Sequence, residues 1–208
     1  MGKLFTTGLT SSILFISLFL IGITLADVIS SDPTGSVSDQ QLEQMTEETI
    51  DELSSYILIK DQIGKFKEIN GNLRIEKIAL WITPLVTQII DVSQLTIQIN
   101  NGESVLFLKY NNNSEELGKF SLFENKIWNN LNGSNFGFIS IIDMDDSLVN
   151  YNTLNDCSDN AYLVFILPES ISFKKHDKIT VTLFPSTGIT RIIELKAPLP
   201  INSVVKFD

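Results

Sequence analysis

Leu95-Thr96-Ile97-Gln98-Ile99 decides the fold class of most of this chain, because its apolar and polar residues alternate strictly. Such alternation is typical of a β-strand that buries one face and exposes the other. The next residues, Asn100-Asn101-Gly102, contain an Asn-Gly pair, which favours a tight hairpin between antiparallel strands. This stretch therefore predicts paired antiparallel strands.

Similar short runs of β-branched and aromatic residues continue from Gly71 to the end of the chain, separated by Asn, Gly, Asp and Pro. Closely spaced strands of this kind predict a mostly antiparallel, Ig-like β-sandwich. We expect a second hairpin turn at 185–188 and, after Pro198 and Pro200, a final edge strand. The expected strands span residues 73–82, 94–100, 104–110, 136–143, 161–167, 178–184, 190–196 and 201–207. This β-sandwich domain is expected at residues 70–208.

The first part of the chain has a different composition. No residue between Lys3 and Asp27 is charged, and residues 13–21 are almost continuously apolar. An uncharged helix of about 20 residues is long enough to cross the hydrocarbon core of a membrane. Three interpretations remain open: a cleaved secretory signal, a permanent single-pass anchor, or a helix that starts in the membrane and ends in a protein assembly.

A polar linker and a second helical pattern follow the apolar run. Residues 30–38 include Pro33, which kinks or breaks a helix. From Asp39 the apolar residues return at helical spacing, with Ser38 as N-cap, and the helix is expected to end near Lys60. These apolar positions are Leu42, Met45, Ile50, Leu53 and Ile57. Residues 1–60 are thus expected to form a long hydrophobic and amphipathic helix, kinked near 32–36, which makes the chain α+β.

Charge and composition exclude several function classes. The 208 residues include 25 acidic and 15 basic ones, a formal charge of −10, whereas phosphate binding requires clustered Lys and Arg. Cys157 is the single cysteine, and the single histidine, His176, lies in a charged turn. No GxxxxGK, GxSxG or HExxH pattern is present. We expect neither an enzyme nor a nucleic-acid-binding protein, and no organic cofactor.

Two kinds of candidate site lie in the predicted loops. Asp143-Met144-Asp145-Asp146-Ser147 is a carboxylate cluster of the kind that binds a hard cation such as calcium, with Asp143 and Asp145 as ligands. It lacks the Gly and the distal Glu of an EF-hand loop, so a plain acidic turn is the alternative. Asn112-Asn113-Ser114 and Asn132-Gly133-Ser134 match the N-glycosylation acceptor pattern, which makes Asn112 and Asn132 candidate glycan sites.

Five separated segments carry a family resemblance. They are Thr7-Gly8-Leu9-Thr10-Ser11-Ser12-Ile13-Leu14-Phe15-Ile16-Ser17, Thr46-Glu47-Glu48-Thr49-Ile50-Asp51-Glu52-Leu53, Ile75-Glu76-Lys77-Ile78-Ala79-Leu80-Trp81-Ile82-Thr83-Pro84, Ile90-Asp91-Val92-Ser93-Gln94-Leu95-Thr96-Ile97 and Leu106 to Tyr110. In this order they resemble the N-terminal helix, its Thr-Glu-Glu end, the first sandwich strand, the Ile-Asp-Leu-Ser motif and the Leu-Lys-Tyr strand of archaeal flagellins (archaellins). The resemblance weakens at 111–135 and at the C-terminal hairpin.

The resemblance implies a structural subunit of the archaellum filament, which propels the cell. Such subunits are made as precursors, trimmed by a type-III (prepilin-like) signal peptidase, held in the membrane, and polymerised through the N-terminal helix with copies of themselves or with other archaellins. The mature location would be an extracellular filament at the archaeal cell surface. The alternative is a membrane-anchored β-sandwich accessory protein of the archaellum or cell envelope that does not polymerise.

Assembly and processing residues follow from the same segment. Burial of a Leu, Ile or Phe side chain contributes about 1.5–3 kcal/mol, so apolar residues of the N-terminal run are the expected assembly contacts. They are Phe15, Ile16, Leu18, Phe19 and Ile21. The family's longer basic leader, ending in Lys-Gly or Arg-Gly, is not matched, since only Lys3 precedes the run. Cleavage after Gly2, cleavage after Gly8 and a leader preceding Met1 are the alternatives.

Overall fold

The alternating segments form strands, and these strands belong to one continuous sheet. The structure is a computed structural model that describes residues 44–46, 56–87, 89–186 and 189–207. In this described part the sheet has ten strands, ordered β11-β10-β4-β5-β6-β8-β2-β1-β12, with β9 beside β2. A smaller sheet pairs β3 with β7. The chain divides into two units, Met1–Glu48 and Thr49–Asp208, and all of these strands lie in the second.

The strands are β1 (Ile57–Ile69), β2 (Asn72–Pro84), β3 (Ile90–Asp91), β4 (Thr96–Asn100), β5 (Val105–Glu116), β6 (Asn135–Ile142), β7 (Thr153–Leu154), β8 (Asn160–Ile166), β9 (Phe173–Lys174), β10 (Lys178–Phe184), β11 (Arg191–Lys196) and β12 (Val204–Lys206). Short helical turns lie between them: η1 (Val92–Gln94), η2 (Leu122–Glu124), η3 (Lys126–Asn129) and α3 (Ser147–Tyr151). Each of the eight strand segments predicted from the sequence contains a strand.

The opening hairpin behaves as its pattern predicts. In β4, Ile97 and Ile99 are buried while the residues between them are partly exposed. β4 pairs antiparallel with β5, and the backbone N–H of Asn101 donates to the carbonyl of Ser104 at 3.3 Å. Gly102 has a φ of 89°, which suits glycine. The loop therefore contains four residues, 101–104, rather than the two of the tightest hairpins.

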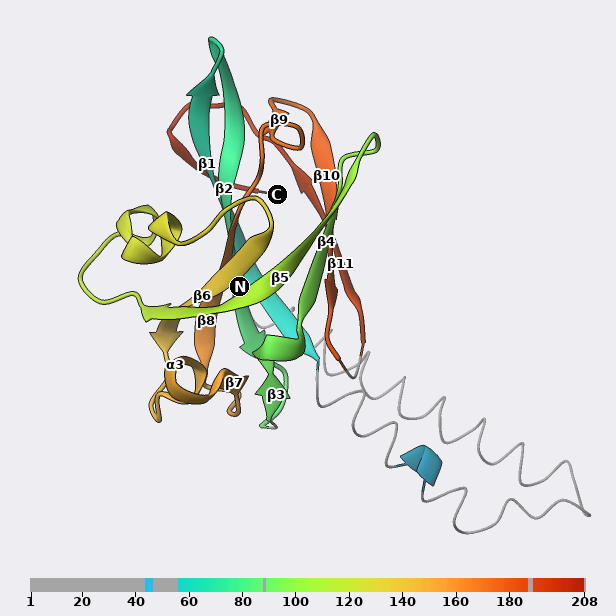
Figure 1. The fold of residues 1–208 in the computed structure, drawn as a ribbon, viewed down its shortest axis with the longest axis vertical. Helices are drawn as coiled ribbons and strands as arrows, with labels where there is room; N and C mark the ends of the chain where they lie inside the picture. The colour runs from blue at the N-terminus through green and yellow to red at the C-terminus, as the bar shows by residue number, and fades with distance from the viewer. Residues whose placement is uncertain (1–43, 47–55, 88, 187–188, 208) are drawn as a thin grey trace, which may run out of the picture. The chain divides into compact units, whose positions relative to one another are not determined.

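The expected mostly antiparallel sandwich is corrected to a single curled sheet, with one parallel pair of strands. β5 continues across the molecule and joins β4, β10 and β11 to β6, β8, β2 and β1, so a single sheet curls around the core (Figure 1). A register shift between Tyr110 and Ser114 bends β5 at this crossing. In addition, β5 and β6 pair in parallel. The long connection through η2 and η3 allows this, because it returns the chain to the starting end of β5 before β6 begins.

Two hydrophobic cores stabilise the domain. The main one fills the curl with side chains from both halves of the sheet, including Ile78, Ile97, Phe138, Phe165 and Val181. The second lies on the outer side of the β2-β8-β6 part, where Ala79, Ile139 and Val164 pack against Phe123, Ile127, Trp128 and Leu131 from the connection through η2 and η3. Since both faces of β8 are covered, its sequence is almost continuously apolar.

The N-terminal boundary of the β-domain is also corrected. The amphipathic helix was expected to end near Lys60 and the β-domain to start near residue 70, but Ile57–Ile69 forms β1, which pairs with β2 along its length. Ile57 continues the helical spacing of Leu53, which explains the wrong boundary. Asn70 and Gly71, with φ of 53° and 75°, form the two-residue turn of this hairpin.

The remaining N-terminal expectations fall outside the described residues. Gln44–Thr46 are described and are helical, in agreement with the predicted amphipathic helix at those three positions. Residues 1–43 and 47–55, which include the apolar run and the kink near 32–36, lie outside them. Within the residues that the structure describes, no helix is long and apolar enough to span a membrane.

Candidate functional site

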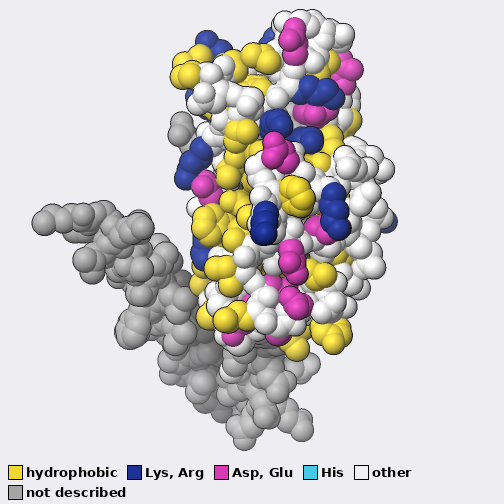
Figure 2. Space-filling view, turned by 90° about the vertical axis from the view of Figure 1, so that its left-hand side faces the viewer, with side chains coloured by type: hydrophobic (Ala, Val, Ile, Leu, Met, Phe, Trp, Pro, Cys, Tyr) yellow, Lys and Arg dark blue, Asp and Glu magenta, His cyan; other side chains and the backbone are white. Residues whose placement is uncertain are grey.

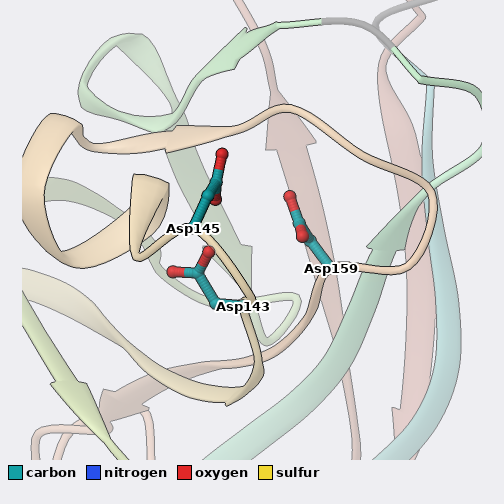
Figure 3. Close-up of side chains that lie close together, drawn as sticks. All are labelled: Asp143, Asp145 and Asp159. Carbon is teal, nitrogen blue, oxygen red and sulfur yellow. The ribbon is translucent and has the colours of Figure 1, made fainter.

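Three carboxylates meet at the end of β6. Antiparallel pairing places Ile142, the last residue of β6, opposite Asn160, the first residue of β8. Asp143 directly follows β6 and Asp159 directly precedes β8. The pairing of these strands therefore brings the two residues together although they are far apart in the sequence. Asp145 joins them from the turn before α3, and all three carboxylates point toward a common space (Figure 3). One carboxylate oxygen from each lies within 4.8 Å of the others.

Hydrogen bonds hold the two predicted ligands in place. Asp143 accepts from the backbone N–H of Leu148 at 3.0 Å and from that of Ser147 at 3.1 Å. Asp145 accepts from Ser147 N–H at 3.1 Å and from the side-chain amide of Asn155 at 2.7 Å. These donors fix the carboxylates without neutralising them, because none carries a positive charge.

Asp159 is the most buried member of the site, with 2% of its surface exposed. One of its carboxylate oxygens accepts from the backbone N–H groups of Asn155 and Asp156, both at 2.9 Å. No Lys or Arg forms a salt bridge with any of the three carboxylates in the described part of the chain. A buried carboxylate with two acidic neighbours is unfavourable unless a proton or a cation balances the charge.

The titration of the site reflects this repulsion. Burial raises the pKa of Asp143, and the neighbouring carboxylates of Asp145 and Asp159 raise it further. Hydrogen bonds from Asn155 and Ser147 lower the pKa of Asp145 to about 2. The pKa values of the two neighbouring carboxyl groups are therefore shifted in opposite directions.

The donor set suits a hard divalent cation. Calcium takes six to eight oxygen ligands and magnesium takes six, and both favour carboxylates and amide or backbone oxygens. Besides the three carboxylates, the side-chain oxygen of Asn155 and the backbone carbonyl of Thr153 lie within hydrogen-bond reach of the Ser147 hydroxyl, at 3.2 and 3.1 Å. The loops that carry the carboxylates thus also hold neutral oxygens next to Ser147, whose backbone N–H donates to Asp143 and Asp145.

Sequence reasoning identified Asp143 and Asp145 but missed Asp159. The structure brings the two predicted residues together and adds the third from a loop sixteen positions further along the chain. The available signal was the antiparallel pairing of β6 and β8, which places the residue before β8 beside the residue after β6. His176, expected in a turn, has a φ of 71° between β9 and β10 and is exposed.

The two glycan acceptor patterns differ in geometry. Asn132 and Ser134 are both exposed, and the Asn132 side-chain oxygen accepts from the Ser134 hydroxyl at 2.6 Å. Asn112 is exposed at the bend of β5, where its side-chain oxygen accepts from the amide of Asn152 at 2.7 Å. In the second pattern the Ser114 hydroxyl bonds instead to the Tyr110 hydroxyl, at 2.7 Å. Of the two patterns, therefore, only the one at Asn132 has a serine hydroxyl that hydrogen-bonds to the side chain of its own asparagine.

The predicted assembly and processing positions cannot be placed in the fold. Phe15, Ile16, Leu18, Phe19 and Ile21, and also Gly2 and Gly8, lie outside the described residues. Apart from residues 44–46, the structure describes the β-domain, which is a curled mixed sheet with few helical turns. Comparison with known proteins covers a larger part of the chain.

The family model of archaeal-type flagellin matches residues 6–195, which is most of the chain. This chain belongs to the archaeal-type flagellin family. It is 28% identical to Flagellin B2 of Methanocaldococcus jannaschii over 204 residues, covering 95% of this flagellin and 90% of the relative. It is therefore a structural subunit of the archaeal flagellum, the archaellum, whose filament is extracellular and serves motility.

Solved structures agree on the fold of this flagellin. The crystal structure of flagellin FlaB1 from M. jannaschii superposes with a TM-score of 0.63 at 20% identity, covering 73% of this chain and 95% of that one. The archaeal flagellum of Methanospirillum hungatei strain JF1 gives a TM-score of 0.51 at 12% identity, covering 97% of this chain and 99% of that one. The family assignment favours the filament subunit over the membrane-anchored accessory protein, and its family is one of structural proteins, not of enzymes.

Proposed function

We propose that this flagellin polymerises through its N-terminal segment, with the β-domain on the outside of the filament. The observation that supports this proposal is the family match over residues 6–195, because the matched range includes both the uncharged run and most of the β-domain. Apolar side chains of the run, Phe15, Leu18 and Phe19 among them, leave lipid for contacts with neighbouring subunits. The transfer is between two apolar media, so the subunit waits in the membrane before assembly at little cost.

The test is a charge in the apolar run. Leu18→Asp places an unpaired carboxylate where helices pack, at a cost of several kcal/mol, and filaments should disappear. Leu18→Met, which keeps volume and polarity, is the matched control and should assemble normally. Negative-stain microscopy of cells producing each variant gives the comparison. Normal filaments in the Leu18→Asp strain would falsify the assembly role.

We propose also that the subunit is cut by a type-III (prepilin-like) signal peptidase before assembly, after Gly2 or after Gly8. The support is that both glycines precede the apolar run, with only Leu9-Thr10-Ser11-Ser12 between Gly8 and the first residue of the run, Ile13. Partial sequencing of filament protein from its N-terminus would identify the site. An intact mass equal to the full 208-residue chain would exclude both cuts.

We propose that Asp143, Asp145 and Asp159 bind a divalent cation such as calcium, which would neutralise the carboxylates and stabilise the loops at the ends of β6 and β8. Binding to the folded form alone raises the melting temperature. Calcium should therefore raise the melting temperature of the wild type, and a chelator should reverse the rise. Asp159→Asn keeps the shape and removes one charge, so its response to calcium should be much smaller. An equal response of wild type and variant would contradict the assignment.

We propose that the chain carries a glycan, and the structure favours Asn132 over Asn112 as its site. The exposed Asn132-Gly133-Ser134 loop presents the amide together with its hydroxyl partner, whereas the hydroxyl of Ser114 is engaged by Tyr110. Asn132→Gln should remove the added mass from protein isolated from its native host, and Asn112→Gln should leave it. An unmodified wild-type mass, or the reverse pattern, would contradict this.

A further inference from the structure

Two lysines face each other on the outer side of the β1–β2 hairpin. Lys65 on β1 is the direct register partner of Lys77 on β2. The connection through η2 and η3 lies against this side of the sheet, and it brings aromatic rings under both ammonium groups. Lys65 Nζ lies 5.8 Å from the ring centroid of Phe123, and Lys77 Nζ lies 4.8 Å from that of Trp128. The two rings stack on each other with centroids 5.5 Å apart. These four residues form the lysine–aromatic face.

In the described part of the β-domain, no salt bridge pairs the two lysines of this face with a carboxylate. Among the described residues the nearby Lys67 pairs with Glu76, and Lys126 pairs with Glu115, but neither Lys65 nor Lys77 forms a salt bridge. Like charges directly opposite each other on neighbouring strands destabilise a sheet. Figure 2 shows lysine or arginine side chains on this side of the molecule, interspersed with hydrophobic and acidic ones. The stability of the fold alone does not explain the lysine pair, because neutral residues at positions 65 and 77 would destabilise the sheet less than two like charges do.

The pKa of Lys77 also indicates that its charge is unfavourable in the isolated β-domain. Partial burial lowers its pKa, and the ammonium groups of Lys65 and Lys67 lower it further, against the opposing effect of Glu76. The face of the Trp128 ring offsets part of the cost of holding the charge. An anionic partner would relieve the remaining repulsion.

A short acidic segment without basic residues lies elsewhere in the chain. Between Lys3 and Lys60 there is no basic residue, and eight of the 25 acidic residues lie there. Six of the eight fall within residues 39–52: Asp39, Glu43, Glu47, Glu48, Asp51 and Glu52. This short acidic segment is complementary in sign to the lysine–aromatic face.

We propose that the lysine–aromatic face of one subunit docks the acidic segment, residues 39–52, of a neighbouring subunit. Two different patches of the same chain that complement each other form a heterologous contact, and repetition of such a contact builds an open helical polymer. The inference rests on the filament function, in which every subunit has neighbours of its own kind. Ammonium groups on an apolar aromatic floor are partly shielded from water, which strengthens their attraction for carboxylates.

The experiment reverses both charges in the full chain. Lys65→Glu with Lys77→Glu should reduce the number of filaments by about tenfold, because two attractive contacts become repulsive. Lys119→Glu with Lys175→Glu is the matched control: both lysines are exposed and the net charge changes equally. Filaments sheared from cells are counted by negative-stain microscopy. The control should assemble as the wild type does.

A charge exchange identifies the partner. Glu47→Lys with Glu48→Lys should also reduce filament number, and combining these with Lys65→Glu and Lys77→Glu should restore it. Equal filament numbers in the Lys65/Lys77 and Lys119/Lys175 variants would overturn the proposal, and so would a combined variant that is no better than its parents. The latter result would point to another anion, such as a lipid headgroup, on the face.

Two further measurements separate the possible failures. Absence of filaments from the wild type would contradict the filament function itself, whereas wild-type filaments with unaffected variants would contradict only this docking. Protease resistance of the membrane-held subunits reports folding. If the Lys65→Glu, Lys77→Glu variant is unfolded, the variant Lys65→Gln with Lys77→Gln tests the docking instead. It removes the repulsion between the two lysines and should stay folded. It should still give fewer filaments than Lys119→Gln with Lys175→Gln. Equal numbers would overturn the docking.

Discussion

Two charged residues of this β-domain lie in surroundings that disfavour their charge. Lys77 is partly buried beside Lys65, and Asp159 is buried beside two carboxylates. In both places a neutral residue would suit the isolated domain better than the charged one. Such residues are therefore the places where a partner or an ion is expected to stabilise the folded chain.

Lys77 leads to a prediction about pH. The pKa of Lys77 is lowered in the folded state. The charge of Lys77 therefore destabilises the folded state at any pH at which the amine is protonated in both the folded and the unfolded chain. As pH rises through the lowered folded pKa towards 10.5, the folded state loses the proton first and this cost disappears. Lys77→Met removes the charge and keeps the contact with Trp128. The difference in free energy of unfolding between this variant and the wild type should therefore shift steadily in favour of the wild type between pH 7 and 10.5. Urea denaturation across this range measures it, and a difference independent of pH would contradict it.

At the scale of elements, the hairpin of β1 and β2 is the part that sequence patterns describe least well. Alternation predicts β4 and β10 because one face of each is buried and the other is partly exposed. In β1, register shifts after Ile59 and Lys65 interrupt the alternation of buried and exposed residues. Its first residue, Ile57, also fits the helical spacing of the apolar residues before it. The parallel pairing of β5 with β6 and the approach of Asp159 to Asp143 depend on which strands become neighbours, and no local pattern carries that information.

The turn of this hairpin gives the second prediction. Gly71 has a φ of 75°, where a side chain costs roughly 1–2 kcal/mol. Gly71→Ala should therefore lower the free energy of unfolding by about 1 kcal/mol, measured by chemical denaturation of the β-domain. Gly71→Asn should lower it less, because Asn tolerates this conformation. Nothing lies within 4 Å of the added Cβ, so the loss would come from the backbone alone. Equal values for Ala and Asn would indicate another cause.

At the scale of the whole molecule, the chain divides into two units, Met1–Glu48 and Thr49–Asp208. The unit from Thr49 onward contains the two hydrophobic cores, while the acidic segment and the apolar run lie largely before it. The fold class of the β-domain and its general role could be predicted from alternation and motif order. Its starting residue could not, since Ile57 fits a helix and a strand equally well until its partner strand is known.

That boundary gives the third prediction. Residues 56–208 should fold as a soluble monomer, whereas residues 70–208 should not, because loss of β1 uncovers Ile75 and Ile78 and leaves β2 unpaired on that side. Circular dichroism and size-exclusion chromatography of the two fragments give the comparison. Equal melting temperatures would show that β1 is dispensable.

The pairing of the first strand with the last has a consequence for how the protein is made. β12 lies along β1, with Ile63 opposite Lys206, and Phe207 packs in the main core against Phe173. A ribosome releases β1 long before β12, so the edge of the hairpin and part of the core stay uncovered while the rest of the domain is synthesised. The domain is completed only after translation has passed Phe207. A chain that ended before β12 would therefore leave the edge of β1 unpaired and the side of Phe173 that contacts Phe207 uncovered.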